Sequence, residues 1–190
     1  NIIDICLPTY MHKDFVVRAA GRGKDILCEK PIALNVEDAD EMIDACSKNN
    51  VRFMVGHVIR FWNEYRFLKE AYDRNNYGAL KSLVCKRLSP MPTWAWQDWL
   101  LNDKQSGGAL TDLHIHDTDF VLYLAGQNPE KVYSRATNLQ GPYSHVFTTF
   151  TFDSGLIASI EGGWDFPASF PFQMSYTARF EKAVVDFHFG

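Results

Sequence analysis

The first 57 residues alternate between short apolar runs and amphipathic segments. His12–Gly21 and the stretch after Asn35 carry apolar residues at helical spacing, and Asn35 can cap the second helix. The apolar runs between them are typical of buried strands, at Ile2–Leu7, Asp25–Cys28 and Val51–Val55. Repeated β-α-β units predict a parallel sheet with helices on its faces.

The pattern changes after residue 60. A helix is predicted from Asn63 to Arg74, a strand over Lys81–Leu88, an irregular stretch over Ser89–Ser106 and a single helix over Gly108–Ala125. The remaining sequence alternates as strands do, and Asp153–Gly155 is a hairpin signal. These strands are expected at Val132–Asn138, His145–Phe152, Leu156–Gly162, Gln173–Phe180 and Ala183–Phe189. Strands that follow one another without helices predict an antiparallel sheet.

The fold class is therefore α/β, in two parts. Residues 1–58 form the C-terminal part of a doubly wound parallel sheet, and residues 59–190 form an α+β domain with an open, mainly antiparallel sheet. Both ends of the sequence fall in strand-like segments, so we expect an internal fragment that is incomplete at both ends. Apolar residues on the uncovered sheet face, among them Phe147, Ile157 and Tyr176, predict a homo-oligomer, a dimer or tetramer.

Composition narrows the class of protein. Of 190 residues, 46% are hydrophobic and 22% are charged, as in a globular protein, and the net charge of −4 without a basic stripe argues against nucleic acid as partner. No apolar run is long enough to span a membrane, and no signal peptide is evident. The four cysteines form no CxxC pair, which indicates reduced thiols, a cytoplasmic location and no structural zinc.

Two segments carry candidate chemistry. Glu29-Lys30-Pro31 closes a predicted strand, at the edge where parallel sheets bind ligands, although such a tripeptide is also common in solvated loops. Asp112 and His116 lie four residues apart on a predicted core helix and so share a face, which suits general acid–base chemistry. The alternative is an ordinary surface pair.

Other residues leave more than one interpretation open. His114, His116, Asp112 and Asp117 resemble a metal cluster, but two histidines two residues apart converge on one metal from a strand and not from a helix. Arg60 could bind an anionic group or pack at a junction. The tryptophans of the irregular stretch could stack on a sugar-sized ligand or anchor a loop, and Trp164 poses the same question; they are Trp94, Trp96 and Trp99.

Taken together, these pieces resemble the Gfo/Idh/MocA oxidoreductases. The resemblance rests on Leu7-Pro8-Thr9 with His12, on Cys28-Glu29-Lys30-Pro31, on Gly56-His57 with Arg60, on Gly107-Gly108 with Asp112 and His116, and on Phe152-Asp153-Ser154-Gly155. It covers nearly the whole chain. The Glu-Lys-Pro and the Gly-Gly…Asp-x-x-x-His together form a specific signature, whereas either alone is weak.

The resemblance implies an NAD- or NADP-dependent dehydrogenase or reductase of a sugar, cyclitol or polyol, with a Rossmann domain before the open-faced domain. Lys30, Asp112 and His116 would then be catalytic. Cofactor would meet Pro8, Thr9, His12, Glu29, Lys30, Pro31 and Arg60; substrate would meet Lys30, Trp96, Trp99, Asp112, His116 and Trp164. No metal is expected. The family's Gly-rich dinucleotide turn and the residue that selects NAD or NADP lie upstream of residue 1.

A mechanism follows from this implication. His116 would take the proton of a secondary alcohol while its hydride leaves, Asp112 would hold the imidazole, and Lys30 would stabilise the alkoxide charge. Two alternatives remain: a non-catalytic nucleotide- or sugar-binding member of the fold, and a metal-dependent hydrolase that uses the His114/His116 cluster.

Overall fold

The structure, a computed structural model, describes residues 1–139 and 143–190. The chain divides into two compact units. The first contains Asn1–His57 and Thr93–Gly107, and the second contains Val58–Pro92 and Gly108–Gly190. The segment 93–107, which the sequence places in the second domain, therefore packs with the first unit.

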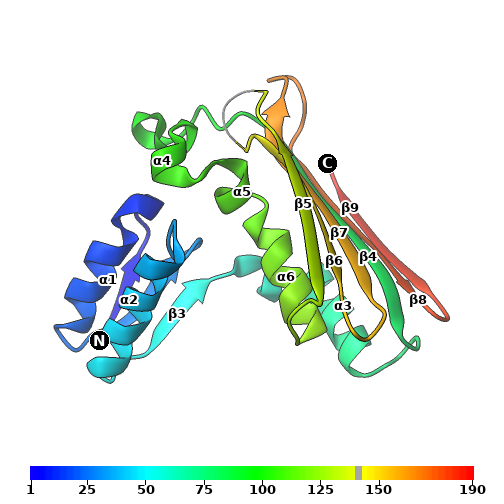
Figure 1. Ribbon diagram of the computed structural model, residues 1–190, viewed down its shortest axis with the longest axis horizontal. Coiled ribbons are helices and arrows are strands. Elements are labelled where there is room, and N and C mark those ends of the chain that lie inside the picture. Colours follow the sequence, from blue (N-terminus) through cyan, green and yellow to red (C-terminus); the bar gives the residue numbers. More distant parts are fainter. Residues whose placement is uncertain (140–142) are drawn as a thin grey trace. The chain divides into compact units, whose positions relative to one another are not determined.

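The first unit is built on a parallel sheet in the order β1-β2-β3, as expected (Figure 1). Its strands are β1 (Ile2–Ile5), β2 (Asp25–Glu29) and β3 (Phe53–Gly56). The helices α1 (His12–Ala20) and α2 (Val36–Lys48) connect them, and a short 3-10 helix, η1 (Thr9–Met11), precedes α1. The segment 93–107 adds η3 (Trp96–Leu101) and α4 (Asp103–Ser106), where the sequence predicts only irregular chain.

Local chemistry explains how these helices begin and pack. The Asn35 side chain accepts a hydrogen bond from the Asp38 amide at 2.7 Å, so the predicted cap of α2 is confirmed. The apolar faces of α1 and α2 bury against the strands in one core, made of Ile5, Val16, Ala19, Ala20, Ile26, Cys28, Met42 and Cys46. This core fixes the strands, and with them the loops at the carboxyl ends of the strands.

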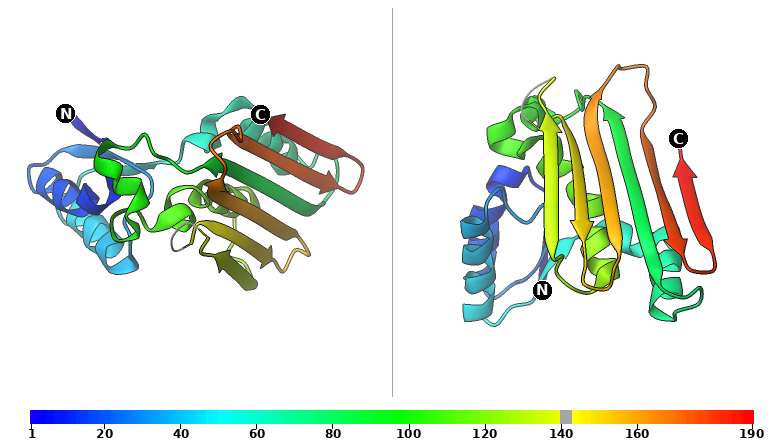
Figure 2. Two further views of the ribbon diagram at one scale, coloured as in Figure 1. Left: turned by 90° about the horizontal axis from the view of Figure 1, so that it is seen from above. Right: turned by 45° about the vertical axis from the view of Figure 1, so that its right-hand side comes forward.

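The second unit is built on a mainly antiparallel sheet in the order β5-β6-β7-β4-β8-β9 (Figure 2). The strands are β4 (Leu80–Pro90), β5 (Lys131–Thr137), β6 (His145–Thr151), β7 (Ile157–Phe166), β8 (Gln173–Phe180) and β9 (Val184–Phe189). Only β4 and β7 run parallel among these described neighbours. The helical elements are η2 (Val58–Phe61), α3 (Asn63–Asp73), α5 (Gly108–Asp112) and α6 (Ile115–Ala125).

The two faces of this sheet differ in what covers them. The helices lie against one face, over a core that includes Leu83, Cys85, Phe120 and Ile160, and no helix of this unit among the described residues covers the other face (Figure 2). Phe147 and Ile157 lie on the uncovered face with about half of their surface exposed. The expectation for Tyr176 is wrong: it is 2% exposed, because the alternation of β8 turns it toward the helices.

The predicted single helix over 108–125 is also wrong, because it breaks at Leu113 and His114. The amides of both residues donate to the carbonyl of Ala109, at 3.1 and 2.8 Å, and the second of these bonds spans five residues as in a π-type turn, so the helix widens and ends before α6 begins. Gly107 and Gly108 have φ of 73° and 70°, a left-handed conformation that favours glycine. Phe120, Val121 and Leu124 are buried as expected, but Leu110 is 37% exposed.

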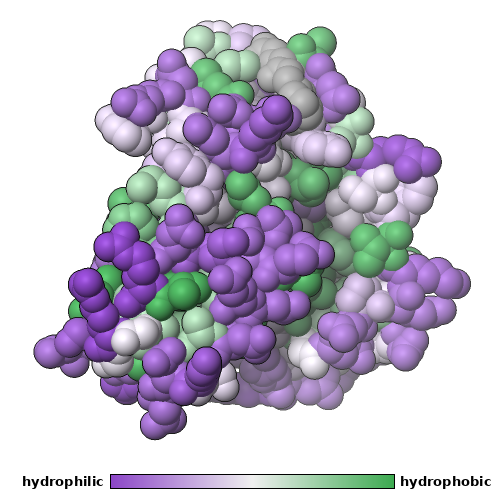
Figure 3. Space-filling model, turned by 60° about the vertical axis from the view of Figure 1, so that its left-hand side comes forward, coloured by the Kyte–Doolittle hydropathy of each residue, from purple (hydrophilic) through white to green (hydrophobic). Residues whose placement is uncertain are grey.

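The surface in Figure 3 is mostly hydrophilic, and hydrophobic side chains form separate small groups on it. Within residues 1–139 and 143–190, no helix combines the length and apolar character that a membrane crossing requires. All four cysteines are free thiols, and only Cys6 is exposed. Burial raises the pKa of the Cys28 thiol to about 12, which keeps it neutral and unreactive.

His114, at the break before α6, is buried and lies against β7. A Cβ placed on Gly162 would meet the Cβ and Cα of His114 at 3.0 and 3.2 Å, so glycine at 162 permits this approach. The His114 Nδ1 is 2.9 Å from the Thr118 hydroxyl oxygen. Burial lowers the pKa of His114 from 6.5 to about 4, although the nearby carboxylate of Asp117 opposes the shift, so the ring is neutral at pH 7.

The buried ring predicts a defined loss of stability in mild acid. The folded protein favours the neutral imidazole, so this stability is present above pH 6.5 and is lost as the pH falls from 6.5 toward 4. The loss reaches about 3 kcal/mol at most. Chemical denaturation of wild type and His114→Asn at several pH values measures it as the difference between them. If the free energy of unfolding changed equally with pH in both proteins between pH 6.5 and 4, this account would be contradicted.

Candidate functional site

Three loops meet at the carboxyl edge of the parallel sheet. They follow the strands directly: Leu7–Thr9 comes after β1, Lys30–Pro31 after β2 and His57 after β3. In open α/β sheets this edge is where ligands bind. Thr9 is buried, whereas Pro8, Glu29 and Lys30 are partly exposed there. The first unit therefore brings together the expected cofactor residues of the first 31 positions.

His12 holds two of these loops together. Its ring is 1% exposed, with Nδ1 3.0 Å from the carbonyl oxygen of Pro31 and Nε2 2.8 Å from that of Leu7. Carbonyl oxygens only accept hydrogen bonds, so the ring is the donor, and a neutral ring with its single N–H donates to one of the two carbonyls at a time. His12 thus fixes the loop that carries Lys30 relative to the end of β1. The expectation that its side chain contacts a cofactor stays a prediction.

The second unit carries Asp112 and His116 on either side of the break. Asp112 ends α5 and His116 is the second residue of α6, and both are partly exposed. His114 and Asp117 are buried, and the residues between and beside them are partly exposed. We call the segment 112–119 the His116 turn. A carboxylate and an imidazole on one exposed turn are groups that can hold and move a proton.

Arg60, from η2, is engaged by this same turn. Its Nε donates to the Asp119 Oδ2 at 2.8 Å, and its Nη2 makes a short contact with Oδ1. The guanidinium also lies over the Tyr123 ring, 4.7 Å from the centroid. The structure therefore gives Arg60 a tethering role on α6. Its expected contact with a cofactor stays a prediction.

The tryptophans differ in exposure. Trp94 and Trp96 are 82% and 63% exposed, and Trp99 is partly buried, all in the first unit. Trp164 is 5% exposed on the helix-covered face of β7. The two residues after Trp96, Gln97 and Asp98, have φ of 52° and 53°, a strained conformation for residues other than glycine. The expected role of Trp96, Trp99 and Trp164 in substrate binding stays a prediction.

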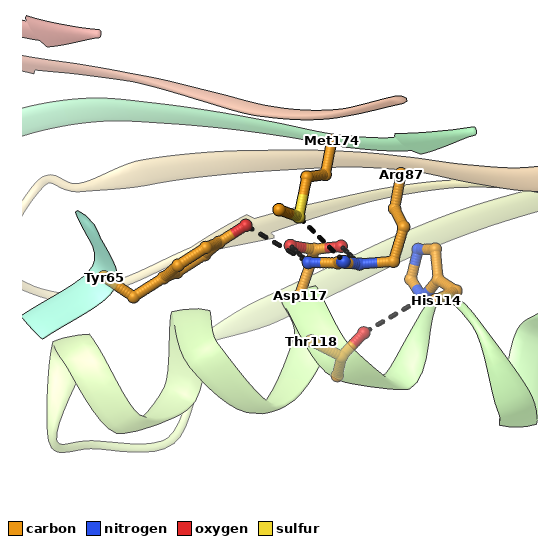
Figure 4. Close-up of polar contacts among 6 residues, drawn as sticks. All are labelled: Tyr65, Arg87, His114, Asp117, Thr118 and Met174. Carbon is orange, nitrogen blue, oxygen red and sulfur yellow. Dashed lines mark hydrogen bonds and ion pairs between the residues drawn. The ribbon is translucent and has the colours of Figure 1, made fainter. Parts of the chain in front are cut away.

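A buried ion pair lies beneath the His116 turn (Figure 4). Arg87 of β4 donates from Nε to the Asp117 Oδ2 at 2.8 Å and from Nη2 to Oδ1 at 3.1 Å. The two side chains are 3% and 0% exposed. Arg87 Nη2 also donates to the Tyr65 hydroxyl oxygen at 3.1 Å, and Nη1 lies 3.5 Å from the Met174 sulfur. Burial raises the pKa of Tyr65, so it remains a neutral phenol.

The metal alternative gains no support from the geometry. Among the described residues, no group of three or more His, Cys, Asp or Glu side chains is arranged to hold a metal ion. His114 faces the sheet and lies beside Thr118, whereas His116 belongs to the partly exposed side of the turn.

Sequence reasoning missed the Arg87–Asp117 pair, although a signal for each partner exists. Arg87 occupies the apolar register of β4, since Leu83 and Cys85 precede it at spacings of four and two. Asp117 stands three residues before the buried Phe120, on the apolar face of α6. A cation in a strand's apolar register together with a carboxylate on a helix's apolar face indicates a buried pair.

Comparisons with known proteins cover both units. Residues 1–57 match the family described as "Oxidoreductase family, NAD-binding Rossmann fold", and residues 65–185 match "GFO/IDH/MocA C-terminal domain". Over 86% of this chain, the sequence is 36% identical to 2,7-anhydro-N-acetylneuraminate hydratase of Escherichia coli, and over 83% it is 30% identical to myo-inositol 2-dehydrogenase of Thermotoga maritima. The chain spans 45% and 48% of those two relatives, about half their length.

Solved structures agree in fold. A myo-inositol dehydrogenase-like protein of Sinorhizobium meliloti matches 97% of this chain and 56% of its own, with a TM-score of 0.84 at 27% identity. The WlbA dehydrogenase of Bordetella pertussis, solved with NADH and UDP-GlcNAcA, matches 99% of this chain and 55% of its own, with a TM-score of 0.89 at 21% identity. With both units matched in sequence, the chain belongs to the Gfo/Idh/MocA family of oxidoreductases, whose N-terminal part is an NAD-binding Rossmann fold.

Proposed function

We propose that the protein is an NAD(P)-dependent oxidoreductase that transfers hydride between nicotinamide and a secondary alcohol of a sugar, cyclitol or related polyol. The observation that carries this proposal is the family match over both units, with Lys30 at the strand edge of the first and with Asp112 and His116, both partly exposed, on either side of the helix break in the second. Relatives named as inositol dehydrogenases support a polyol as substrate.

We assign the nicotinamide end of a dinucleotide to the carboxyl edge of the parallel sheet. Pro8 and Glu29 offer an apolar and a polar surface there, and Lys30 adds a cation at the same edge. His12 holds the loops that carry these residues at a fixed separation. Bound nicotinamide would supply the acceptor or donor of hydride, while the protein supplies orientation and electrostatics. The choice between NAD and NADP is left to measurement.

We assign the proton and charge chemistry to His116, Asp112 and Lys30, as follows. His116 would take the hydroxyl proton of the alcohol, since an imidazole changes charge near neutral pH. Asp112 would hold the imidazole and stabilise its cationic form. Lys30 would stabilise the negative charge that develops on the alcohol oxygen. The reverse reaction uses the same groups, with His116 returning the proton.

A second candidate is a hydratase of an anhydro sugar. Two relatives with that name, from Escherichia coli and Mediterraneibacter gnavus, are 36% and 38% identical, above the 30% and 33% of the inositol dehydrogenases of Thermotoga maritima and Rhizobium meliloti. Hydration adds water without net oxidation. A hydratase would therefore consume its substrate without accumulating reduced nicotinamide, which separates the two candidates.

Turnover of a substrate panel tests the proposed function. We expect the full-length protein to reduce NAD⁺ or NADP⁺ in the presence of at least one inositol or sugar, with measurable nicotinamide absorbance. The panel includes 2,7-anhydro-N-acetylneuraminate, whose loss is followed by NMR. Its conversion without net nicotinamide reduction would favour the hydratase. Calorimetric binding of NAD⁺ without turnover of any compound would favour a non-catalytic binding protein.

Replacement of the proposed base is a separate test. We expect His116→Ala to lower kcat by about 10²–10⁴-fold, because the variant lacks the proposed base, while NAD⁺ affinity measured by calorimetry stays close to wild type. His188→Ala, at a side chain 71% exposed on β9, is the matched control and should keep wild-type turnover. A His116→Ala variant with near-normal kcat would refute the assignment.

The uncovered face of the second unit's sheet is proposed to pair with a second copy of the chain. A shallow groove on this face is lined by Val84, Lys86, Phe147, Thr148, Thr149, Ser159, Ile160 and Glu161. Lys86 and Glu161 form an ion pair at 3.0 Å, and Phe147 lies opposite Glu161 on the neighbouring strand. The face therefore presents a cation, an anion and an apolar group, which the same groups of a second copy can match. An exposed sheet face with such apolar residues favours association.

Light scattering tests this pairing. We expect a dimer or tetramer at micromolar concentration and a shift toward monomer in Phe147→Asp, because a charge would be buried in the interface. Val36→Asp, at a residue 69% exposed in the first unit, is the control. A wild-type monomer, or an unchanged assembly in Phe147→Asp, would rule out this face.

A further inference from the structure

Asp117, the residue that follows His116, is buried and held by an ion pair. Asp117 is 0% exposed, and both of its carboxylate oxygens accept hydrogen bonds from the guanidinium of Arg87, 2.8 and 3.1 Å away. Two parallel hydrogen bonds between planar groups set distance and orientation together. The first turn of α6 is thereby locked in rotation and depth against β4, the central strand beside it.

The Arg87 guanidinium contacts two further elements besides α6. Tyr65 of α3 accepts from Arg87, and Met174 of β8 lies against the third nitrogen (Figure 4). The Tyr65 ring packs edge-on against Phe120 of α6, with centroids 4.8 Å apart, and against Tyr176 at 5.4 Å. Arg87 therefore cannot follow Asp117 if the turn shifts, because its own surroundings are close-packed.

Stability alone does not account for a buried pair in this place. Desolvation of two charges offsets most of their attraction, and replacement of a buried ion pair by apolar residues of similar volume is often neutral or stabilising. The surrounding core is apolar and would accept such residues. What the pair adds over apolar packing is a defined geometry for one helical turn.

From these contacts we propose that Arg87 and Asp117 are positioning residues for His116. The inference rests on the proposed function. The neighbouring contacts act in the same direction: His114 lies against Gly162 on one side of His116, and Arg60 holds Asp119 on the other. The His116 turn is thus fixed at positions 114, 117 and 119, which leaves the partly exposed His116 on a rigid support. A displacement of about 1 Å at such a group can cost about 10²-fold in rate.

The double variant Arg87→Met/Asp117→Leu separates positioning from stability, because it removes the pair without leaving an unpaired buried charge. We expect a folded protein whose melting temperature lies near that of wild type. Its kcat for the polyol that the panel identifies should fall about 10- to 100-fold, with KM for NAD⁺ within about two-fold. Amides of residues 114–118 should exchange with deuterium about ten-fold faster.

A control variant and a second variant make the test decisive. Lys81→Met removes an exposed ion pair on the same strand and should change neither readout. A folded double variant that keeps wild-type kcat, or one that loses kcat without faster exchange of 114–118, would overturn the proposal. If the double variant does not fold, Arg87→Lys keeps the charge without the two-pronged geometry, and normal kcat in that variant would overturn it equally.

If wild type turns over no compound of the panel, the proposed function fails by itself. The exchange of residues 114–118 in the double variant then decides whether the pair rigidifies the turn: faster exchange supports that role, and unchanged exchange refutes it.

Discussion

Arg87 and Asp117 impose a constraint on the second unit that its apolar core alone does not. Two opposite charges with almost no exposed surface must stay in contact, since separating them would leave each one buried and unpaired. That requirement joins the middle of β4 to the first turn of α6. Tyr65, Phe120 and Tyr176 then pack around the pair, so the aromatic core and the ion pair specify the same arrangement.

The first unit solves a similar problem with a buried histidine. The loops after β1 and β2 have no strand to hold them, and His12 bridges them through the carbonyl oxygens of Leu7 and Pro31. In both units a buried polar side chain therefore fixes a segment whose neighbours are exposed: Lys30 beside Pro31, and His116 beside Asp117. Rigid support of partly exposed polar groups is what catalysis requires of a protein scaffold.

Much of this architecture could be predicted from the sequence, because it depends on periodicity. The parallel β-α-β pattern, the Asn35 cap and the antiparallel strands after residue 130 follow from alternation and helical spacing, and the structure confirms them. The break at Leu113 and His114 was not predictable in this way, since the apolar spacing runs through it. It depends on the close approach of His114 to Gly162, which is about fifty residues away in sequence. The burial of Tyr176 was missed because register in β8, and not hydrophobicity, decides which face a residue takes.

The candidate site likewise contains residues that the sequence predicts and contacts that it does not. Lys30, Asp112 and His116 are predicted from motifs, whereas the contacts that hold the segment around His116 depend on Arg87, Asp117 and Tyr65, which come from three separate segments. The most direct measurement of the central claim is a crystal structure of the full-length protein with NAD⁺ and the polyol that it oxidises. The account predicts that a ring nitrogen of His116 lies about 3 Å from the substrate hydroxyl that reacts. A reacting hydroxyl bound by other residues, with His116 out of reach, would contradict it.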